Sequence, residues 1–177
     1  MTLTTQPRAR SASGFSLLET VFALSLLMVV ALGLLPLGVI ATTTTENQGH
    51  LMARTTEYAQ DKMEQLLALA FNDVTSDTRL FPATDTGGTG LAIGGSAVAA
   101  SPVAKYVDYL DVNGSLMASS GTTAPTDWYY KRVWSVAYVS GSTTMKKITV
   151  TATTRSAVGS TGRTPTATVS SVKTYPF

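Results

Sequence analysis

Side chains able to carry out chemistry are scarce in this sequence. There is no cysteine, which excludes thiolate nucleophiles, thiolate metal sites and disulfides. His50 is the single histidine, so the sequence does not predict a histidine-based metal or acid–base site. The glycines around Gly88 miss the spacing of a nucleotide-binding loop, and no nucleophile elbow is present. We therefore expect a protein that is not an enzyme and has no cofactor.

Two pairs of carboxylates are the remaining candidates for a metal site. Asp108 with Asp111, or Asp73 with Asp77, offers oxygen atoms of the kind that calcium prefers. Carboxylates in loops are more often simply solvated than bound to an ion. The prediction from the sequence is therefore that no metal is bound.

Glu19 is the carboxylate in the least expected place. It lies inside a run of 27 residues, Phe15 to Ala41, that is otherwise almost entirely apolar. Val21 to Ile40 alone would form about 30 Å of helix, which is enough to span a bilayer. A carboxylate at membrane depth is costly unless it is paired, and such residues are usually functional.

The residues before this run have the character of an export signal. Residues 1–14 are polar, carry Arg8 and Arg10, and contain no acidic side chain. The apolar run is too long for the core of a secretory signal, and no small-x-small cleavage site follows it. The two arginines before the span predict that the N-terminus stays inside the cell and the rest lies outside. A plain signal-anchor helix is the alternative.

The junction Gly14-Phe15-Ser16-Leu17-Leu18-Glu19 resembles the prepilin peptidase site of type IV pilins and type II secretion pseudopilins. The resemblance covers residues 8–41. It implies cleavage between Gly14 and Phe15, N-methylation of Phe15, and a role for Glu19 in subunit assembly. Pro36 stands where long pilins usually have a proline that loosens the helix, and in that family this region can unwind in the assembled filament.

The same resemblance implies partners and a location. The partners are other pilin subunits, the prepilin peptidase and the pilus assembly platform. The chain would reside in the bacterial inner membrane as a single span with its N-terminus in the cytoplasm, and later in a pilus that crosses the periplasm to the cell surface. Between stacked subunits, the Glu19 carboxylate can pair with the terminal amine of a neighbour, which relieves the cost of an unpaired charge.

The chain divides into four segments: a leader (1–14), a hydrophobic transmembrane or filament helix (15–41), an amphipathic stalk helix (42–69) and a β-rich head (70–177). In the stalk, apolar side chains recur every three to five residues, with charged side chains on the other faces. The apolar set is Leu51, Thr55, Tyr58, Met63, Leu66 and Leu69, and the charged set is Glu46, Arg54, Glu57, Asp61 and Glu64. The poor helix propensity of Thr42–Thr45 makes continuity weakest there.

The head is predicted to begin with a long surface loop, residues 70–104, that acts as a flexible connector. A hairpin should follow, with strands Val107–Val112 and Ser115–Ala118 around a type I′ turn at Asn113-Gly114. Asn113 also begins a formal glycosylation acceptor, but the turn is the favoured interpretation. Three further strands are expected at the end of the chain: Trp128–Val139, Met145–Thr154 and Ala167–Tyr175.

The alternation in these strands predicts a sheet that is covered on one face. Ile148, Val150 and Ala152 share that face, and we expect Trp134, Val136 and Tyr138 to join them against the stalk helix. The predicted fold class is therefore α+β, with a long N-terminal helix packed on a mainly antiparallel sheet.

The segments Tyr130–Val136 and Lys146–Thr151 resemble the type IV pilus modification family, a class of minor pilins. Many major pilins close a C-terminal loop with a cysteine pair, which this chain lacks. The resemblance therefore implies a minor subunit.

The charges are unevenly distributed along the sequence. All eleven acidic residues precede Trp128, and seven lysines and arginines follow it. We expect the basic strands to complement the acidic stalk, within one molecule or between subunits. The alternative is a surface for polyanions such as DNA or lipopolysaccharide.

Together these observations predict a minor pilin, a non-enzymatic structural subunit of a type IV pilus. Two alternatives remain open. One is a minor pseudopilin of type II secretion, and the other is an exported, membrane-anchored protein that binds a polyanion.

Overall fold

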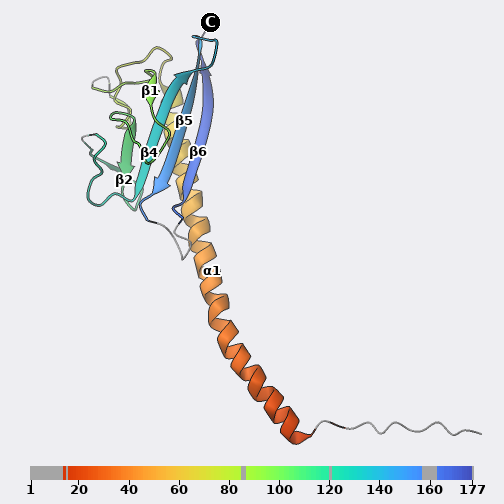
Figure 1. The fold of residues 1–177 in the computed structure, drawn as a ribbon. Helices are drawn as coiled ribbons and strands as arrows, with labels where there is room; N and C mark the ends of the chain where they lie inside the picture. The colour runs from red at the N-terminus through yellow and green to blue at the C-terminus, as the bar shows by residue number, and fades with distance from the viewer. Residues whose placement is uncertain (1–13, 15, 85–86, 120, 157–162, 177) are drawn as a thin grey trace, which may run out of the picture. The chain divides into compact units, whose positions relative to one another are not determined.

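The computed structural model describes residues 14, 16–84, 87–119, 121–156 and 163–176, and shows one helix followed by strands (Figure 1). The elements are α1 (Leu17–Ala68), β1 (Gly94–Gly95), β2 (Val107–Leu110), β3 (Leu116–Met117), β4 (Tyr130–Tyr138), β5 (Met145–Thr154) and β6 (Thr166–Thr174). The predicted α+β fold class is confirmed. The expected start of the helix, Phe15, lies outside the described residues.

The chain forms two compact units that divide between Thr43 and Thr44, within α1. In the first unit, the backbone is helical from Leu17 onward and continues through Pro36. The threonines that made continuity doubtful remain helical. Their hydroxyls donate to helix carbonyls, at 3.0 Å from both Thr42 and Thr43 to Val39 O.

The second unit contains a six-stranded sheet in which the described pairs are all antiparallel. Its order is β3-β2-β4-β5-β6, and β1 pairs with β4 beyond the end of β2. The bounds of β5 match the predicted Met145–Thr154, and β4 and β6 lie within two residues of their predicted starts. Strand β6 is the last strand of this order on its side of the sheet.

The main core lies between the sheet and the second half of α1. Trp134, Val136, Ile148, Val150 and Ala152 are buried there, against Ala59, Met63 and Leu66 of the helix. This confirms the predicted inner face for five of its six members.

Tyr138 is the exception, because it is 47% exposed. It pairs with Lys146, which pairs with Lys173, and the Lys173 ammonium reaches the carbonyl of Leu67 at the end of α1. Tyr138 therefore lies where the helix stops, and no helical residue remains to cover it.

The sheet is also covered on part of its outer face, which the sequence did not predict. Val107, Tyr109 and Val133 form a second buried cluster. Partly buried side chains from β3 and from the preceding and following loops pack on it: Ala99, Met117, Ala124 and Trp128. All four residues of β2 are consequently buried.

Residues 70–104 are largely irregular, as predicted, but they are not simply a flexible surface loop. Phe71 and Leu91 are buried, and β1 adds to the sheet. The Asp73 carboxylate accepts hydrogen bonds from the backbone N–H groups of Thr75 and Ser76, each at 3.0 Å. This segment therefore folds onto the head as part of it.

The β2–β3 hairpin forms, but its turn differs from the predicted type I′. Gly114 has φ 85°, whereas Asn113 does not have a positive φ. The Gly114 N–H donates to Asp111 O at 3.1 Å, and the Asp111 N–H donates to Ser115 O at 2.9 Å. This is a type I turn closed by a glycine bulge. The Asp111 carboxylate favours it by accepting from the N–H groups of Asn113 and Ser115, each at 2.8 Å.

Candidate functional site

The predicted processing site lies at the tip of α1. Gly14 is exposed, and a Cβ atom placed on it would meet nothing within 4 Å. Phe15 lies outside the described residues. Ser16 precedes the helix, and its hydroxyl accepts the Glu19 N–H at 3.2 Å. Ser16 is therefore the N-cap, and Glu19 occupies the third helical position.

The cap at Ser16 was missed in the sequence, and its hydrogen bond uses the backbone N–H of Glu19 and not the Glu19 carboxylate. A carboxylate in the first turn also interacts favourably with the positive end of the helix dipole. Glu19 is exposed and so remains accessible to a partner. The structure brings Gly14 and Glu19 to the same tip, whereas Pro36 lies 17 residues further along the helix.

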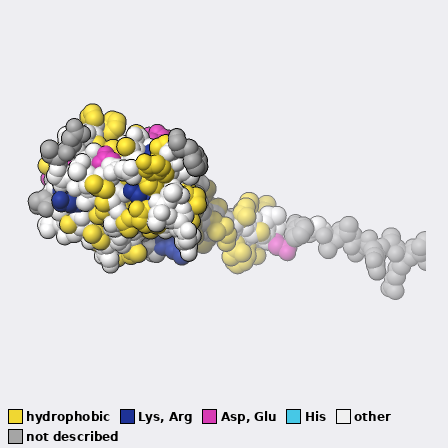
Figure 2. Space-filling model, turned by 90° about the horizontal axis from the view of Figure 1, so that it is seen from above, with side chains coloured by type: hydrophobic (Ala, Val, Ile, Leu, Met, Phe, Trp, Pro, Cys, Tyr) yellow, Lys and Arg dark blue, Asp and Glu magenta, His cyan; other side chains and the backbone are white. Residues whose placement is uncertain are grey.

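The helix that follows is apolar around its whole circumference. Leu17 and Leu18 are each 82% exposed, and the large apolar side chains from Val21 to Ile40 are each more than half exposed. Figure 2 shows this part of the helix with a largely hydrophobic surface. In the described part of the chain, α1 alone is long and apolar enough to cross a membrane. Such a surface requires lipid or other apolar helices around it.

The predicted loosening at Pro36 is not a break in this structure. The helix passes through Gly33, Pro36 and Gly38 without interruption, and side-chain space around both glycines is open. Pro36 removes one backbone hydrogen bond, which weakens the helix locally. Unwinding stays a prediction for the assembled state.

A buried ionic cluster joins α1 to the sheet within the head. Asp108 of β2 accepts from the Lys62 ammonium at 2.8 Å and from the Arg132 guanidinium at 2.7 and 2.9 Å. Arg132 also donates to Asp61 of the helix at 2.8 Å. The side chains of Lys62, Asp108 and Arg132 are between 1% and 3% exposed. We call these four residues the ionic cluster.

The electrostatics of the ionic cluster favour its charged form at Asp108. Burial alone raises the pKa of Asp108, but the charges of Arg132 and Lys62 outweigh burial and hold that pKa below its ordinary value. Burial lowers the pKa of Lys62, an effect that Asp108 partly offsets. The Lys62 ammonium also donates to the carbonyl of Thr78 and lies 4.3 Å from the centre of the Trp134 ring.

This cluster was not predicted from the sequence, because its members lie far apart in the chain and are of ordinary types. In the sequence, Lys62 stands between the charged Asp61 and the apolar Met63, so the helical pattern does not assign it to a face. Its inward direction follows from the packing of α1 against β2 and β4. The indication in the sequence was that Asp108 and Arg132 are charged residues at positions where the neighbouring strand residues on the same face are apolar.

The candidate calcium ligands are engaged elsewhere. Both oxygens of Asp108 belong to the ionic cluster, and Asp111 and Asp73 accept backbone N–H groups in turns. Asp77 pairs with Arg79 at 2.6 Å. Across the ranges that the structure describes, acidic, histidine and cysteine side chains do not gather in threes.

The basic residues of the last strands divide into two groups. Arg132 belongs to the ionic cluster, Lys146 is buried and donates to Phe71 O and Leu91 O, and Lys173 donates to Leu67 O at the end of α1. These three cations face inward. Lys147 and Arg155 are exposed, and Lys131 is half-buried beside Trp128. Much of the apparent basic surface is therefore internal.

Comparisons with family models, curated proteins and solved structures give no match to this chain. What the geometry itself establishes is the architecture: a long N-terminal helix, apolar and exposed over its first half, packed over its second half on an antiparallel sheet. The architecture is pilin-like.

Proposed function

We propose that this chain is a minor pilin, a structural subunit that the prepilin peptidase processes and that assembles into a type IV pilus through its N-terminal helix. The observation that carries the proposal is the exposed apolar surface of α1 from Leu17 to Ile40. A head held on the second half of the same helix gives each subunit a part for the filament core and a part for its outside.

The tip of the helix supports the processing step. Gly14 is exposed and outside the helix, so a peptidase can reach the bond that follows it. In the proposed filament, Glu19 pairs with the terminal amine of a neighbouring subunit, since an unpaired carboxylate among apolar helices is costly. Before assembly, the chain resides in the bacterial inner membrane and engages the assembly platform.

Two alternatives are separated from this proposal by different observations. A minor pseudopilin would share every feature of α1, and neighbouring genes for a pilus or for a secretin with its exoproteins would separate the two. A polyanion-binding surface is favoured less, because Arg132, Lys146 and Lys173 are turned inward.

Processing can be tested by Gly14→Val. A peptidase that recognises this position should tolerate little bulk there, although the structure offers the valine open space and predicts no folding defect. The expected result is an uncut precursor that stays in the membrane and out of filaments. Gly38→Ala, also in open space, is the matched control and should be cut normally. Mature-length protein from Gly14→Val would refute the assignment.

A further inference from the structure

A cleft of about 930 Å³ lies within the second unit, between α1 and the start of β6. The helix provides one side of it, and the segment that leads into β6 provides the other. The lining residues are Thr45, Gln48, Gly49 and Met52 of α1, and residues 163–166. A volume of this size is in the range of sites that hold small molecules or parts of larger ones.

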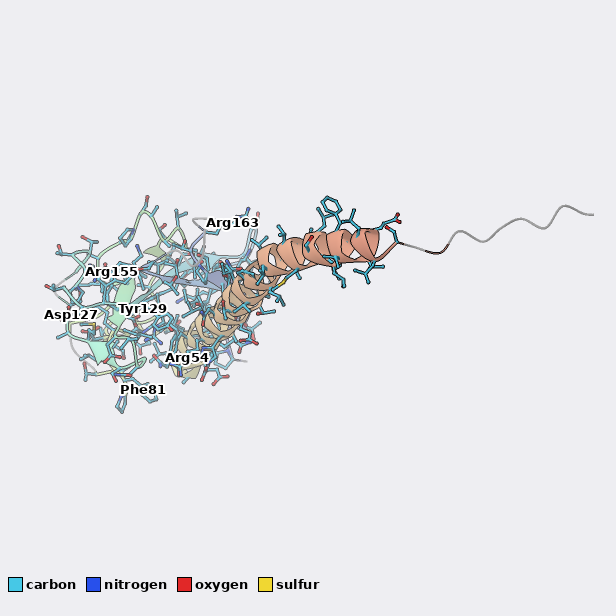
Figure 3. All side chains as sticks on the ribbon, turned by 90° about the horizontal axis from the view of Figure 1, so that it is seen from below. Arg54, Phe81, Asp127, Tyr129, Arg155 and Arg163 are labelled. Atoms are coloured by element: carbon cyan, nitrogen blue, oxygen red, sulfur yellow. The ribbon has the colours of Figure 1, made fainter. Side chains whose placement is uncertain are left out.

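Arg163 supplies the charge of this cleft. Among the described residues that line it, Arg163 alone is charged. Its side chain is exposed and has no hydrogen bond or ion pair within the described ranges. Arg155, by contrast, donates to Thr126 O at 2.7 Å and lies near the Trp128 ring. Figure 3 shows Arg163 apart from both Arg155 and Arg54, so it does not share its surroundings with either of them.

The acidic residue of α1 next to the cleft does not face into it. Because a helix turns about 100° per residue, the four lining residues of α1 occupy a sector of about 100° around its axis. Glu46 lies about 60° outside that sector, and it is not among the lining residues. The cleft therefore offers a guanidinium to a ligand without a lining carboxylate. Phosphate and carboxylate oxygens are the acceptors that best match a guanidinium.

Gly49 leaves the helix side of the cleft open. A Cβ atom at this position would meet nothing within 4 Å, and its φ is not positive. Glycine inside a helix costs about 0.5–1 kcal/mol relative to alanine. Since no close contact within the described chain requires this glycine, its effect on the structure is to let a ligand approach the backbone of α1.

The cleft begins shortly beyond the apolar part of α1. Thr45 follows Ile40 by five residues, or about 7.5 Å of helix, and Met52 follows it by twelve, or about 18 Å. On each side of a bilayer, the headgroups occupy about 5–7.5 Å beyond the hydrocarbon core. When Val21–Ile40 span the membrane, the start of the cleft is therefore at the margin of the headgroup layer. An arginine at that level can extend its side chain to a lipid phosphate.

We propose that this cleft binds the headgroup phosphate of a phospholipid from the outer leaflet of the membrane that α1 spans. The Arg163 guanidinium donates to the phosphate oxygens, and the exposed hydroxyl of Thr164 is a further donor. Met52 and Pro165 provide apolar contacts for the carbon atoms of the lipid. The contact ties the start of β6 to the bilayer until the subunit leaves the membrane. The inference rests on the membrane insertion in the proposed function and adds a lipid ligand to it.

Photolabelling of the full-length chain in nanodiscs tests this site. The discs consist of galactosyldiacylglycerol, which has no phosphate, with a trace of phosphatidylglycerol that carries a diazirine at the start of one acyl chain. Mass spectrometry measures the ratio of label on Thr45–Met52 to label on Val21–Ile40, where label reports ordinary contact with the bilayer. We expect Arg163→Gln to lower this ratio about fivefold, because one arginine contributes about 1 kcal/mol at a lipid surface.

Two further variants separate the site from general effects of substitution. Arg155→Gln is the matched control, because Arg155 is also exposed but does not line the cleft, and it should leave the ratio unchanged. Gly49→Phe should lower the ratio as Arg163→Gln does, because the ring fills the open space while Arg163 keeps its charge.

The lipid composition and the buffer identify the ligand. Unlabelled phosphatidylglycerol as the main lipid should lower the ratio by competition, whereas an excess of inorganic phosphate in the buffer should leave it unchanged. Equal ratios in the native chain and Arg163→Gln would overturn the inference. Loss of the native ratio on adding inorganic phosphate would also overturn it, because the cleft would then be a site for free phosphate.

Failure of this inference can be told apart from failure of the proposed function. Absence of label on Val21–Ile40 would contradict the membrane span itself. A chain that is recovered in filaments but shows no effect of Arg163→Gln contradicts the lipid site alone. A chain that shows this effect but never enters filaments contradicts the proposed assembly alone.

Discussion

At the scale of single residues, Glu19 is the side chain with two physical roles. As a carboxylate in the first turn it interacts favourably with the positive end of the helix dipole, and as a carboxylate in an apolar surface it requires a partner once other helices surround it. The dipole interaction acts within one subunit, whereas the pairing role acts only between subunits.

Substitution of Glu19 tests the pairing role. Glu19→Gln retains the size and polarity of the side chain but removes its charge, and Glu19→Ala removes the polar group as well. If pairing dominates, both variants should be inserted and cleaved normally but recovered in sheared filaments at least tenfold less, a difference of about 1.4 kcal/mol. Glu19→Asp should be intermediate, since it retains the charge but has a shorter reach. Wild-type recovery of Glu19→Gln would show that pairing is not required.

Asp108 is the shared counter-ion of two buried cations in the head. Its removal leaves Lys62 and Arg132 buried without their shared counter-ion, and breaking a buried pair in this way costs about 3–5 kcal/mol. Asp108→Asn should therefore lower the urea concentration at which half of the heads are unfolded. Tryptophan fluorescence of the protein in detergent measures this midpoint. Asp127→Asn, at an exposed carboxylate, is the matched control and should change it little. Equal midpoints for the two variants would contradict the stabilising role of the cluster.

The same carboxylate sets a dependence on acid. The pKa of Asp108 is lower in the folded state than its ordinary value of about 3.9, so the unfolded state binds more protons in this range. Its stabilisation is complete above that ordinary value and is lost as the pH falls through the lowered one. At pH values below about 4, we expect the urea concentration at the unfolding midpoint to decrease. This decrease should be less steep in Asp108→Asn. An equally steep fall in that variant would assign the effect to other groups.

At the scale of elements, the turn between β2 and β3 illustrates what the sequence could and could not reveal. Asn113-Gly114 correctly indicated a hairpin, but Asp111 decided the turn type by accepting two backbone N–H groups. Gly114 serves a second purpose that no local pattern shows. A Cβ atom there would lie 2.3 Å from the Tyr58 hydroxyl oxygen of α1.

Gly114→Ala should therefore destabilise the head by more than its backbone conformation alone requires. Gly141 has a similar φ of 78°, but a Cβ atom there meets nothing within 4 Å. Gly141→Ala should lower the free energy of unfolding by about 1–2 kcal/mol. Gly114→Ala should lower it by about 1–3 kcal/mol more, because only there does the added methyl group collide with a side chain. Truncation by Tyr58→Ala should then cost less in Gly114→Ala than in the native chain. Additive costs would show that Tyr58 is not the obstacle.

The long elements were predictable because their signals are periodic. The bounds of α1 and β5, and the inner face of the sheet, follow from apolar spacing alone. The outer cluster around Val133 and the burial of Lys62 were not predictable. Both depend on which segments, far apart in the sequence, come into contact. Lys62 can be buried because Asp108, from such a distant segment, compensates its charge.

At the scale of the whole molecule, the two units need different surroundings to be stable. The first presents apolar side chains on all sides and is stable only among lipids or other helices. The second has its own core, and its cations are divided between the interior and the surface. In the proposed filament the first unit provides packing and Glu19, and the second forms the head on the outside.

The central claim is that this chain is a processed subunit of a pilus, and the N-terminus of the protein recovered from sheared, purified filaments tests it most directly. Mass spectrometry of that material should find chains that begin at Phe15 with a methylated amine and lack residues 1–14. If the chain is absent from filaments, or is found in them still joined to residues 1–14, the account is contradicted.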